Sequence, residues 1–375
     1  MSRVFPAHWN VLQFSDAIKD ATSEYSKLQK SEYLEHGSFP IVDQGQQQFG
    51  GYTNNKSVIS VGSCPAIVFG DHTRIFKFVD EPFCLGADGA KVLEPKVELD
   101  KKFLFYYLSS LNIESAGYSR HFKFLKKNMI PVPSLSEQKR IAAILDKADA
   151  ICRKRQQAIQ LADDFLRAVF LDMFGELVTS SGYRNAHKYK LQELADYIDY
   201  RGKTPEKSEH GVPLITAKNV KKGFVDDEPR EYIPEENYDA WMTRGFPKKN
   251  DILFTTEAPL GNVALLGEYK KVSIGQRLIA LRSKGKVTHE YLMFLLLHPF
   301  VQNLIYARSS GSTVKGIRTK ELYAIELPVP DMQKQEEFSA IYWKNISLKT
   351  NQESARQLEI LKFSSLVQKA FSGML

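Results

Sequence analysis

A long run without Pro or Gly, residues 134–174, constrains the fold of this chain more than any other feature. Pro131 and Pro133 hold the approach to it extended, because a residue before Pro is disfavoured in the α region. Ser134 is a natural N-cap, and Glu137 completes the pattern of a capping box. The run predicts one helix of about 39 residues, which would reach roughly 58 Å. Its heptad stripe, which favours packing along another helix, consists of Ile141, Leu145, Ala148, Cys152, the polar Arg155, Ile159, Ala162, Leu166, Val169 and Met173.

The start of this helix occurs a second time near the C-terminus. The segment LPVPDMQKQEEFSAI repeats IPVPSLSEQKRIAAI, so that Gln335 falls on Gln138 and Asp331 replaces Ser134 as N-cap. A second helix of similar length is therefore expected. Buried polar positions fix the register of such a helix at a cost in stability, and its expected stripe is Phe338, Ile341, Asn345, Leu348, Gln352 and Ala355.

The segments ahead of the two helices also repeat in the same order. LQELADYI aligns with VLQFSDAI, VPLITAKNV with FPIVDQGQQ, and HEYLMFLLL with DKKFLFYYL, while Gly275 falls on Gly86. In the first copy we expect strands at 58–61, 66–69 and 75–79 and a helix at 101–111. A repeat of this length indicates two copies of a domain. The prediction is an α/β (α+β) domain at 1–133, a helix at 134–180, a second domain at 181–330 and a helix at 331–375.

The composition narrows the class of protein. In 375 residues, 51 Lys and Arg against 44 Asp and Glu give a net charge of +7, which permits a polyanionic partner without requiring one. Cys64, Cys84 and Cys152 lie far apart without a CxxC pair, so no disulfide framework or thiolate zinc site is expected. The N-terminus lacks a signal-peptide core, and the longest apolar run, 291–297, is far shorter than a membrane helix. We expect a cytoplasmic protein with no membrane contact.

The motifs of the main catalytic alternatives are missing. An adenine methyltransferase is expected to carry an Asn/Asp-Pro-Pro-aromatic motif, and the sequence has no Pro-Pro dipeptide. The nearest string to a P-loop, GSTVKGIR, places Ile317 and Arg318 where Lys and Ser or Thr must hold phosphate and Mg²⁺. Asp80, Glu94 and Lys96 match a nuclease pattern only loosely. The sequence thus suggests neither a catalytic residue nor a metal ligand.

The ordered repeat resembles the specificity subunit of type I restriction-modification enzymes. The Pro-x-Pro helix starts carry the resemblance together with PIVDQGQ and GGYT in the first copy and PLITAKNV, DILFTTEAPLGNVAL and SSGSTVKGI in the second. The resemblance spans the whole chain. It implies two target recognition domains, each reading one half of a bipartite sequence in double-stranded DNA. It also implies that the long helices form an antiparallel coiled coil with pseudo-twofold symmetry, whose length sets the gap between the half-sites.

The resemblance further implies a chain with no catalysis and no cofactor of its own. Two methylation subunits, which bind S-adenosylmethionine and modify adenine at N6, would dock on it. Restriction subunits that use ATP and Mg²⁺ would join them.

Side-chain chemistry identifies candidates for DNA contact in the expected loops. Gln and Asn can pair with adenine in the major groove and Arg or Lys with guanine, whereas Ser, Thr and Lys mostly hold phosphates. The first domain offers Gln44, Gln46, Gln47, Gln48, Asn54, Asn55, Lys56, Arg120, His121 and Lys123. The second domain offers Arg201, Lys203, Lys218, Asn219, Lys221, Gln276, Arg277, Ser310, Ser312, Thr313 and Lys315.

A second hypothesis stays open at this point. The chain could be a non-catalytic coiled-coil assembly scaffold whose domains bind protein, since the net charge is mild. Salt dependence separates the two, because a protein that grips phosphates loses affinity for duplex DNA steeply as salt rises.

Overall fold

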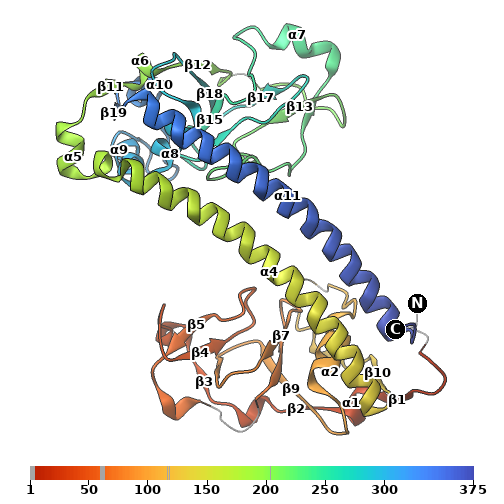
Figure 1. Cartoon of the computed structure of the whole chain (residues 1–375). Coiled ribbons are helices and arrows are strands. Elements are labelled where there is room, and N and C mark those ends of the chain that lie inside the picture. Colours follow the sequence, from red (N-terminus) through yellow and green to blue (C-terminus); the bar gives the residue numbers. More distant parts are fainter. Residues whose placement is uncertain (1–4, 60–63, 116, 118, 203) are drawn as a thin grey trace. The chain divides into compact units, whose positions relative to one another are not determined.

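The computed structural model describes residues 5–59, 64–115, 117, 119–202 and 204–375. The chain forms two compact units, residues 1–157 with 353–375 and residues 158–352. Two long helices, α4 (Leu135–Phe174) and α11 (Met332–Phe371), each pass from one unit into the other (Figure 1). Each unit therefore contains one globular domain and half of both long helices. The predicted fold class, two α+β domains joined by two long helices, is confirmed.

The domain of the first unit is built on two four-stranded sheets. One has the order β2-β9-β6-β7 and is antiparallel, and the other has the order β3-β8-β4-β5 with parallel pairs on both sides of β8. A separate antiparallel pair, β1 with β10, leads into α4. The elements are β1 (Asn10–Gln13), α1 (Phe14–Ala17), β2 (Ile18–Asp20), β3 (Lys27–Leu28), β4 (Phe39–Val42), β5 (Gly51–Thr53), β6 (Ala66–Gly70), β7 (Phe76–Val79), β8 (Cys84–Gly86), β9 (Ala90–Pro95), α2 (Lys101–Ser109), α3 (Phe122–Leu125) and β10 (Met129–Val132).

The domain of the second unit repeats this plan. Its antiparallel sheet has the order β12-β18-β15-β16, its second sheet has the order β14-β13-β17 with a parallel β13–β17 pair, and β11 pairs with β19 ahead of α11. The elements are α5 (Ser180–Asn185), β11 (Lys188–Lys190), α6 (Leu191–Leu194), β12 (Ala195–Asp199), β13 (Val212–Ile215), β14 (Tyr232–Ile233), α7 (Tyr238–Trp241), β15 (Ile252–Thr255), β16 (Val263–Leu265), β17 (Ser273–Ile274), β18 (Leu278–Ser283), α8 (His289–Leu297), α9 (Pro299–Ala307), α10 (Thr319–Tyr323) and β19 (Glu326–Pro328).

Aromatic side chains attach each domain to its helix halves. In the first unit, the ring of Phe103 in α2 lies 5.5 Å from that of Phe371 in α11. In the second, Phe170 of α4 lies 5.5 Å from Phe338 of α11 and 5.5 Å from Phe294 of α8. These rings are buried or half-buried, so each domain shares its hydrophobic core with both long helices.

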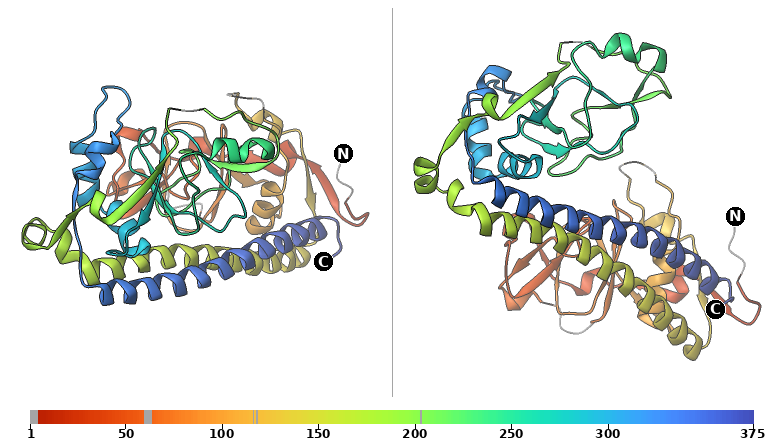
Figure 2. Two further views of the ribbon diagram at one scale, coloured as in Figure 1. Left: turned by 90° about the horizontal axis from the view of Figure 1, so that it is seen from above. Right: turned by 45° about the horizontal axis from the view of Figure 1, so that its top comes forward.

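The two long helices run antiparallel within each unit, as expected (Figure 2). In the first unit the start of α4 meets the end of α11, where Arg140 donates a hydrogen bond of 2.6 Å to the backbone oxygen of Leu375. In the second unit the end of α4 meets the start of α11, where the rings of Phe174 and Phe338 lie 5.8 Å apart. Nearer the middle of both helices, Lys349 Nζ lies 2.8 Å from the Asp163 carboxylate. Ser134 caps α4, accepting from the backbone N–H of Glu137 at 3.4 Å.

The predicted stripe of α4 is confirmed, and that of α11 is confirmed at every position except Leu348. The members of the α4 stripe are buried or half-buried. In α11, Phe338 and Asn345 are buried as expected, whereas Leu348 is 57% exposed and Tyr342 is buried. The correct inward position is that of Lys349, whose charge is held by Asp163. An ion pair in the seam is invisible to a search for apolar periodicity.

The glutamine that follows each Pro-x-Pro motif explains why the helix start is repeated. Gln138 is buried, and its Oε1 accepts a hydrogen bond of 2.7 Å from the N–H of Asp100, the N-cap of α2. Gln335 is also buried and accepts at 2.9 Å from the N–H of Thr288, the N-cap of α8. Each Nε2 donates at 2.9 Å to the carbonyl of the second Pro of its own motif. Each glutamine therefore fastens a long helix to a domain helix.

The structure corrects parts of the predicted alignment. Gly86 ends β8 and Gly275 directly follows β17, and these strands pair in parallel with β4 and β13, so the two glycines are equivalent as expected. Leu191, however, begins α6 as Phe14 begins α1, three residues from the expected register. A slip of three is nearly one helical turn and preserves the apolar pattern. Similarly, Thr288 rather than the following residue is equivalent to Asp100.

Most of the expected local elements are present. The strands predicted at 66–69 and 75–79 and the helix at 101–111 correspond to β6, β7 and α2. The strand expected at 58–61 is wrong where it can be seen, because Val58 ends a 3-10 turn, Lys56–Val58, and residues 60–61 lie outside the described residues. Helix α9 was not predicted. Over the described ranges, no helix is long and apolar enough to cross a membrane.

Candidate nucleic-acid interface

Three segments of the first domain meet beyond the end of β6. The N–H of Asp71, in the turn after β6, donates a hydrogen bond of 2.6 Å to the carbonyl of Gly89, the residue before β9. The carbonyl of Asp71 accepts at 2.9 Å from the N–H of His121, the residue before α3. The loop that contains Arg120 is thereby held beside the start of β9.

The second domain makes the same connection with different residues. The N–H of Thr256, after β15, donates at 2.9 Å to the carbonyl of Arg277, the residue before β18. The carbonyl of Thr256 accepts at 2.9 Å from the N–H of Ile317. The Gly-Ser loop at 308–316 thus occupies the place of the basic loop in the first domain. Both predicted loops lie at equivalent positions of the repeated fold.

Gln44 belongs to this face of the first domain. It follows β4, its backbone carbonyl accepts at 2.6 Å from Thr73 Oγ1, and its Oε1 accepts at 3.3 Å from the N–H of His72. Lys77 stabilises the loop, because its buried Nζ donates at 2.8 Å to the carbonyl of Asp43. Burial lowers the pKa of Lys77 although the charge of Asp43 opposes this. Gln44 is therefore held by its neighbours.

The other polar candidates of the first loop are exposed. Gln48 Nε2 donates at 2.8 Å to the carbonyl of Phe78. Asn54 Oδ1 accepts at 2.9 Å from the N–H of Ser38, and Asn55 Oδ1 accepts at 3.0 Å from that of Ser57 and caps the 3-10 turn. These contacts stabilise turns and leave the surface accessible. The remaining exposed members are Gln46, Gln47 and Lys56.

The basic segment around α3 separates into exposed cations and a buried histidine. Arg120 and Lys123 are exposed. His121 is 1% exposed and its Nδ1 lies 2.9 Å from the carbonyl of Asp71, so we remove it from the candidates. Lys126 and Lys127, which follow α3, are exposed as well and were not predicted. Their signal was the Lys-Lys pair near the end of the basic and aromatic segment FKFLKKN.

Several candidates of the second domain surround one cavity of about 420 Å³. Arg201, Gln276, Arg277 and Ser310 come from three separate segments of the chain to line it. Arg318 also lines the cavity and was not predicted, although it follows the Gly-Ser loop directly. The other candidates of that loop are exposed and are Ser312, Thr313 and Lys315.

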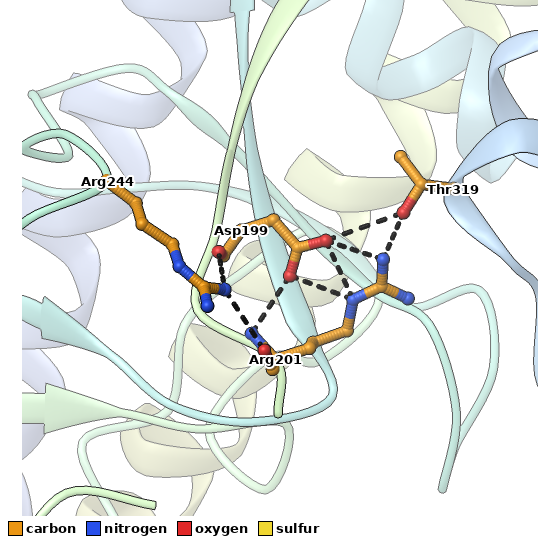
Figure 3. A network of polar contacts seen from close by, with 4 residues as sticks. All are labelled: Asp199, Arg201, Arg244 and Thr319. Carbon is orange, nitrogen blue, oxygen red and sulfur yellow. Dashed lines mark hydrogen bonds and ion pairs between the residues drawn. The ribbon is translucent and has the colours of Figure 1, made fainter. Parts of the chain in front are cut away.

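The guanidinium of Arg201 is used within the domain (Figure 3). Its Nε donates at 2.9 Å and its terminal nitrogen at 2.6 Å to the two carboxylate oxygens of Asp199, and the same nitrogen contacts Thr319 Oγ1. Arg244 donates at 2.8 Å to the backbone carbonyl of Asp199. Burial raises the pKa of the Asp199 carboxyl. The hydrogen bonds and positive charge of Arg201 together lower this pKa by more, so that it lies below its ordinary value. Arg201 therefore fastens the end of β12 to α10.

The remaining candidates of the second domain include one buried residue and residues that solvent can reach. Asn219 is 2% exposed; its Oδ1 accepts at 3.0 Å from both N–H and Oγ1 of Thr216, and its Nδ2 donates to two backbone carbonyls. With all its hydrogen-bonding groups used, Asn219 is removed from the candidates. Lys218 is exposed, and Lys221 Nζ donates at 2.6 Å to the Lys218 carbonyl. Lys203 lies outside the described residues.

Arg277 and Gln276 are neighbours in the chain and both line the cavity. Arg277 has a backbone φ of 65°, in the left-handed region. Its Nε lies 3.1 Å from Glu257 Oε1. Gln276 Nε2 donates to Thr204 Oγ1. In the part of the chain that the structure describes, no group of three or more His, Cys, Asp or Glu is placed to hold a metal ion.

The chain is similar to known proteins both in sequence and in structure. A family model described as type I restriction modification DNA specificity domain matches residues 9–161 and 183–360. The Escherichia coli type I restriction enzyme EcoR124I/EcoR124II specificity subunit is 24% identical over 332 residues, covering 82% of this chain and 80% of the relative. The Methanocaldococcus jannaschii type I restriction enzyme MjaVIII specificity subunit is 22% identical over 360 residues, covering 88% and 84%. The crystal structure of a type I restriction-modification S subunit from M. genitalium matches with a TM-score of 0.60 at 16% identity, covering 99% of this chain and 97% of the other.

Proposed function

This chain belongs to the family of type I restriction-modification DNA specificity domains, and on that premise we propose that it binds a bipartite target in double-stranded DNA, one half-site for each domain. It is a DNA sequence-specificity subunit without catalysis of its own, as the names of its relatives indicate. The observation that carries the proposal is the repeated face. In both domains the turn after β6 or β15 holds a polar or basic loop beside the start of a strand.

The side chains on these faces suit DNA. Arg120, Lys123 and Lys126 provide positive charge in the first domain, while Arg277 and Arg318 do so in the second. Cations of this kind neutralise phosphates, and arginine and amide groups also pair with base edges. The buried candidates His121 and Asn219 are excluded, and the exposed ones remain proposed DNA contacts.

The resemblance extends the proposal to partners. Two methylation subunits would dock on this chain and modify adenine with S-adenosylmethionine, and restriction subunits using ATP and Mg²⁺ would join them. We retain the predicted boundaries, in which residues 1–133 and 181–330 are the two recognition domains and residues 134–180 and 331–375 are the long helices. We also retain a cytoplasmic location, where these partners and the DNA meet.

A map of methylated adenines tests the proposal directly. DNA from cells that express this chain with its cognate methylation subunit should carry modification at a split motif. Cells with the methylation subunit alone should lack it. Methylation that is absent, or present without this chain, would contradict the proposal and favour an assembly scaffold.

The long helices supply a second test. Insertion of one heptad into α4 or α11 should change the preferred gap between the half-sites and leave the bases of each half-site unchanged. The reason is that both helices run unbroken between the two domains. Altered bases at an unchanged gap would overturn the role of the helices as spacers.

A further inference from the structure

One position of the repeated face carries unlike residues under the same backbone constraint. Gly89 precedes β9 with a φ of 72°, and Arg277 precedes β18 with a φ of 65°. Each carbonyl accepts the equivalent hydrogen bond from the turn after β6 or β15. Glycine adopts this left-handed conformation freely, whereas a residue with a Cβ is strained in it. An arginine here is unfavourable for the fold, and such strain points to a function of the side chain.

The side chain of Arg277 is oriented by one carboxylate and otherwise open. Its Nε lies 3.1 Å from Glu257 Oε1, and the side chain is 56% exposed. Among the described residues, Glu257 is its one polar partner. The backbone of Glu257 is itself fixed, because it forms a bridge with Gly316 of the Gly-Ser loop. Within the described part of the chain, neither terminal nitrogen of the guanidinium donates a hydrogen bond to another residue.

Arg201 shows what a structural arginine looks like in the same cavity. Its Nε and one terminal nitrogen both donate to Asp199, and Thr319 is a further contact of that nitrogen. The two arginines were equal as sequence candidates. The structure uses the donor fork of Arg201 internally and leaves that of Arg277 accessible.

We propose, on the basis of the proposed function, that Arg277 reads a guanine in the half-site of the second domain and that Glu257 is its positioning residue. Two parallel N–H donors match the O6 and N7 acceptors on the major-groove edge of guanine, a pattern that no other base presents. A phosphate is a poorer ligand at this place, because the carboxylate of Glu257 lies beside the guanidinium and repels an anion. A neutral base edge meets no such repulsion.

The test uses the complex of this chain with its cognate methylation subunits. Arg277→Gly removes the side chain and is compatible with the backbone, as Gly89 demonstrates. Arg277→Lys keeps the charge but not the fork. Glu257→Gln removes the positioning charge. Arg230→Ala is the matched control, because Arg230 Nε lies 3.2 Å from Glu228 Oε1 in the same domain but does not line the cavity.

The readouts are the methylation motif and the binding of duplexes with each base at each position of the half-sites. Arg277→Gly should abolish the preference for guanine at one position of one half-site, a loss of roughly 5- to 150-fold in discrimination. Arg277→Lys should retain part of it, and Glu257→Gln should weaken it by less than Arg277→Gly. The other half-site, the gap and the motif of Arg230→Ala should be unchanged. Replacing that guanine by 7-deazaguanine should weaken the wild-type complex and leave Arg277→Gly unaffected.

Three outcomes would overturn the inference while the proposed function stands. The first is a wild-type split motif that Arg277→Gly leaves unaltered. The second is a uniform loss of affinity over all sequences, which would identify a phosphate contact. The third is a change of specificity at a base other than guanine. If instead the wild-type complex methylates no split motif, it is the proposed function that fails.

Discussion

The two domains share their framework and differ on the face beyond β6 and β15. Gln138 and Gln335 make the same hydrogen bonds to a domain helix, and both are buried. On the exposed face, by contrast, Gly89 of one copy corresponds to Arg277 of the other. The glutamine that joins each long helix to its domain is the same in the two copies, whereas the exposed position of Gly89 and Arg277 is not. This division is what a chain that reads two different half-sites requires.

Replacing the buried glutamines gives the largest expected effect and tests whether the framework is equivalent in the two copies. Gln138→Leu and Gln335→Leu should each lower the free energy of unfolding by about 2–4 kcal/mol, because each leaves the N–H of a helix N-cap and its neighbours without partners. Urea unfolding followed by circular dichroism measures this. Gln333→Leu, on the exposed side of α11, is the control. Unequal losses from the two variants would show that the copies do not share this joint.

The framework could be predicted from the sequence for a physical reason. The Pro-x-Pro start and the N-cap act through local geometry, and together with the glutamine they occur twice, so two independent copies gave the same signal. One position of the α11 seam was predicted wrongly, because Lys349, paired with Asp163, takes the inward place that was assigned to Leu348. Contacts between segments far apart in sequence leave no periodic trace.

The exposed face was predicted less well, and Asn219 and Arg277 show why. Both belong to residue types that can read bases, and both follow strands. One is consumed by the hydrogen bonds of its own turn, and the other is held toward solvent by Glu257. Composition cannot distinguish them, since turns and base recognition use the same amide and guanidinium groups. The missed Arg318 lies next to the predicted loop and needed the cavity to identify it.

Gly89→Ala is expected to have the next largest effect, and it tests the difference between Gly89 and Arg277 in their tolerance of a left-handed backbone. The added Cβ would impose left-handed strain and overlap Oε1 of Gln44, so we expect a loss of about 1–2 kcal/mol in unfolding free energy. Arg277→Gly should change stability by less than about 1 kcal/mol, because relief of strain offsets the lost contact with Glu257. Gly117→Ala, at a φ of 65° with open space around it, separates strain from crowding. Equal losses in Gly89→Ala and Gly117→Ala would show that Gln44 is not packed on Gly89.

Asp199→Asn tests the arginine that the second domain uses internally. The pKa of Asp199 lies below its ordinary 3.8, so its contribution to stability is complete above that value and is lost as pH falls through the lower folded pKa. The variant should be less stable than the wild type by about 1 kcal/mol or less near neutral pH, for a pair that is partly exposed. The difference should shrink as the pH falls below 3.8. Urea midpoints over this pH range measure it, and Asp196→Asn controls for one negative charge lost from the same strand. If the stability difference between wild type and Asp199→Asn does not vary with pH, Asp199 does not have a lowered pKa in the folded protein.

The smallest expected effects come from single exposed lysines, and they distinguish phosphate contacts from base contacts on both faces. Lys123→Ala in the first domain and Lys315→Ala in the second should weaken binding of the complete complex to all duplexes alike. Each should reduce the slope of log affinity against log salt concentration by about 1, because each phosphate contact releases about one condensed counterion. Arg277→Gly should leave this slope nearly unchanged while it alters the motif. If a lysine variant changed the motif in its own half-site, that lysine would be a base reader. The proposed base-reading face of that domain would then include this lysine.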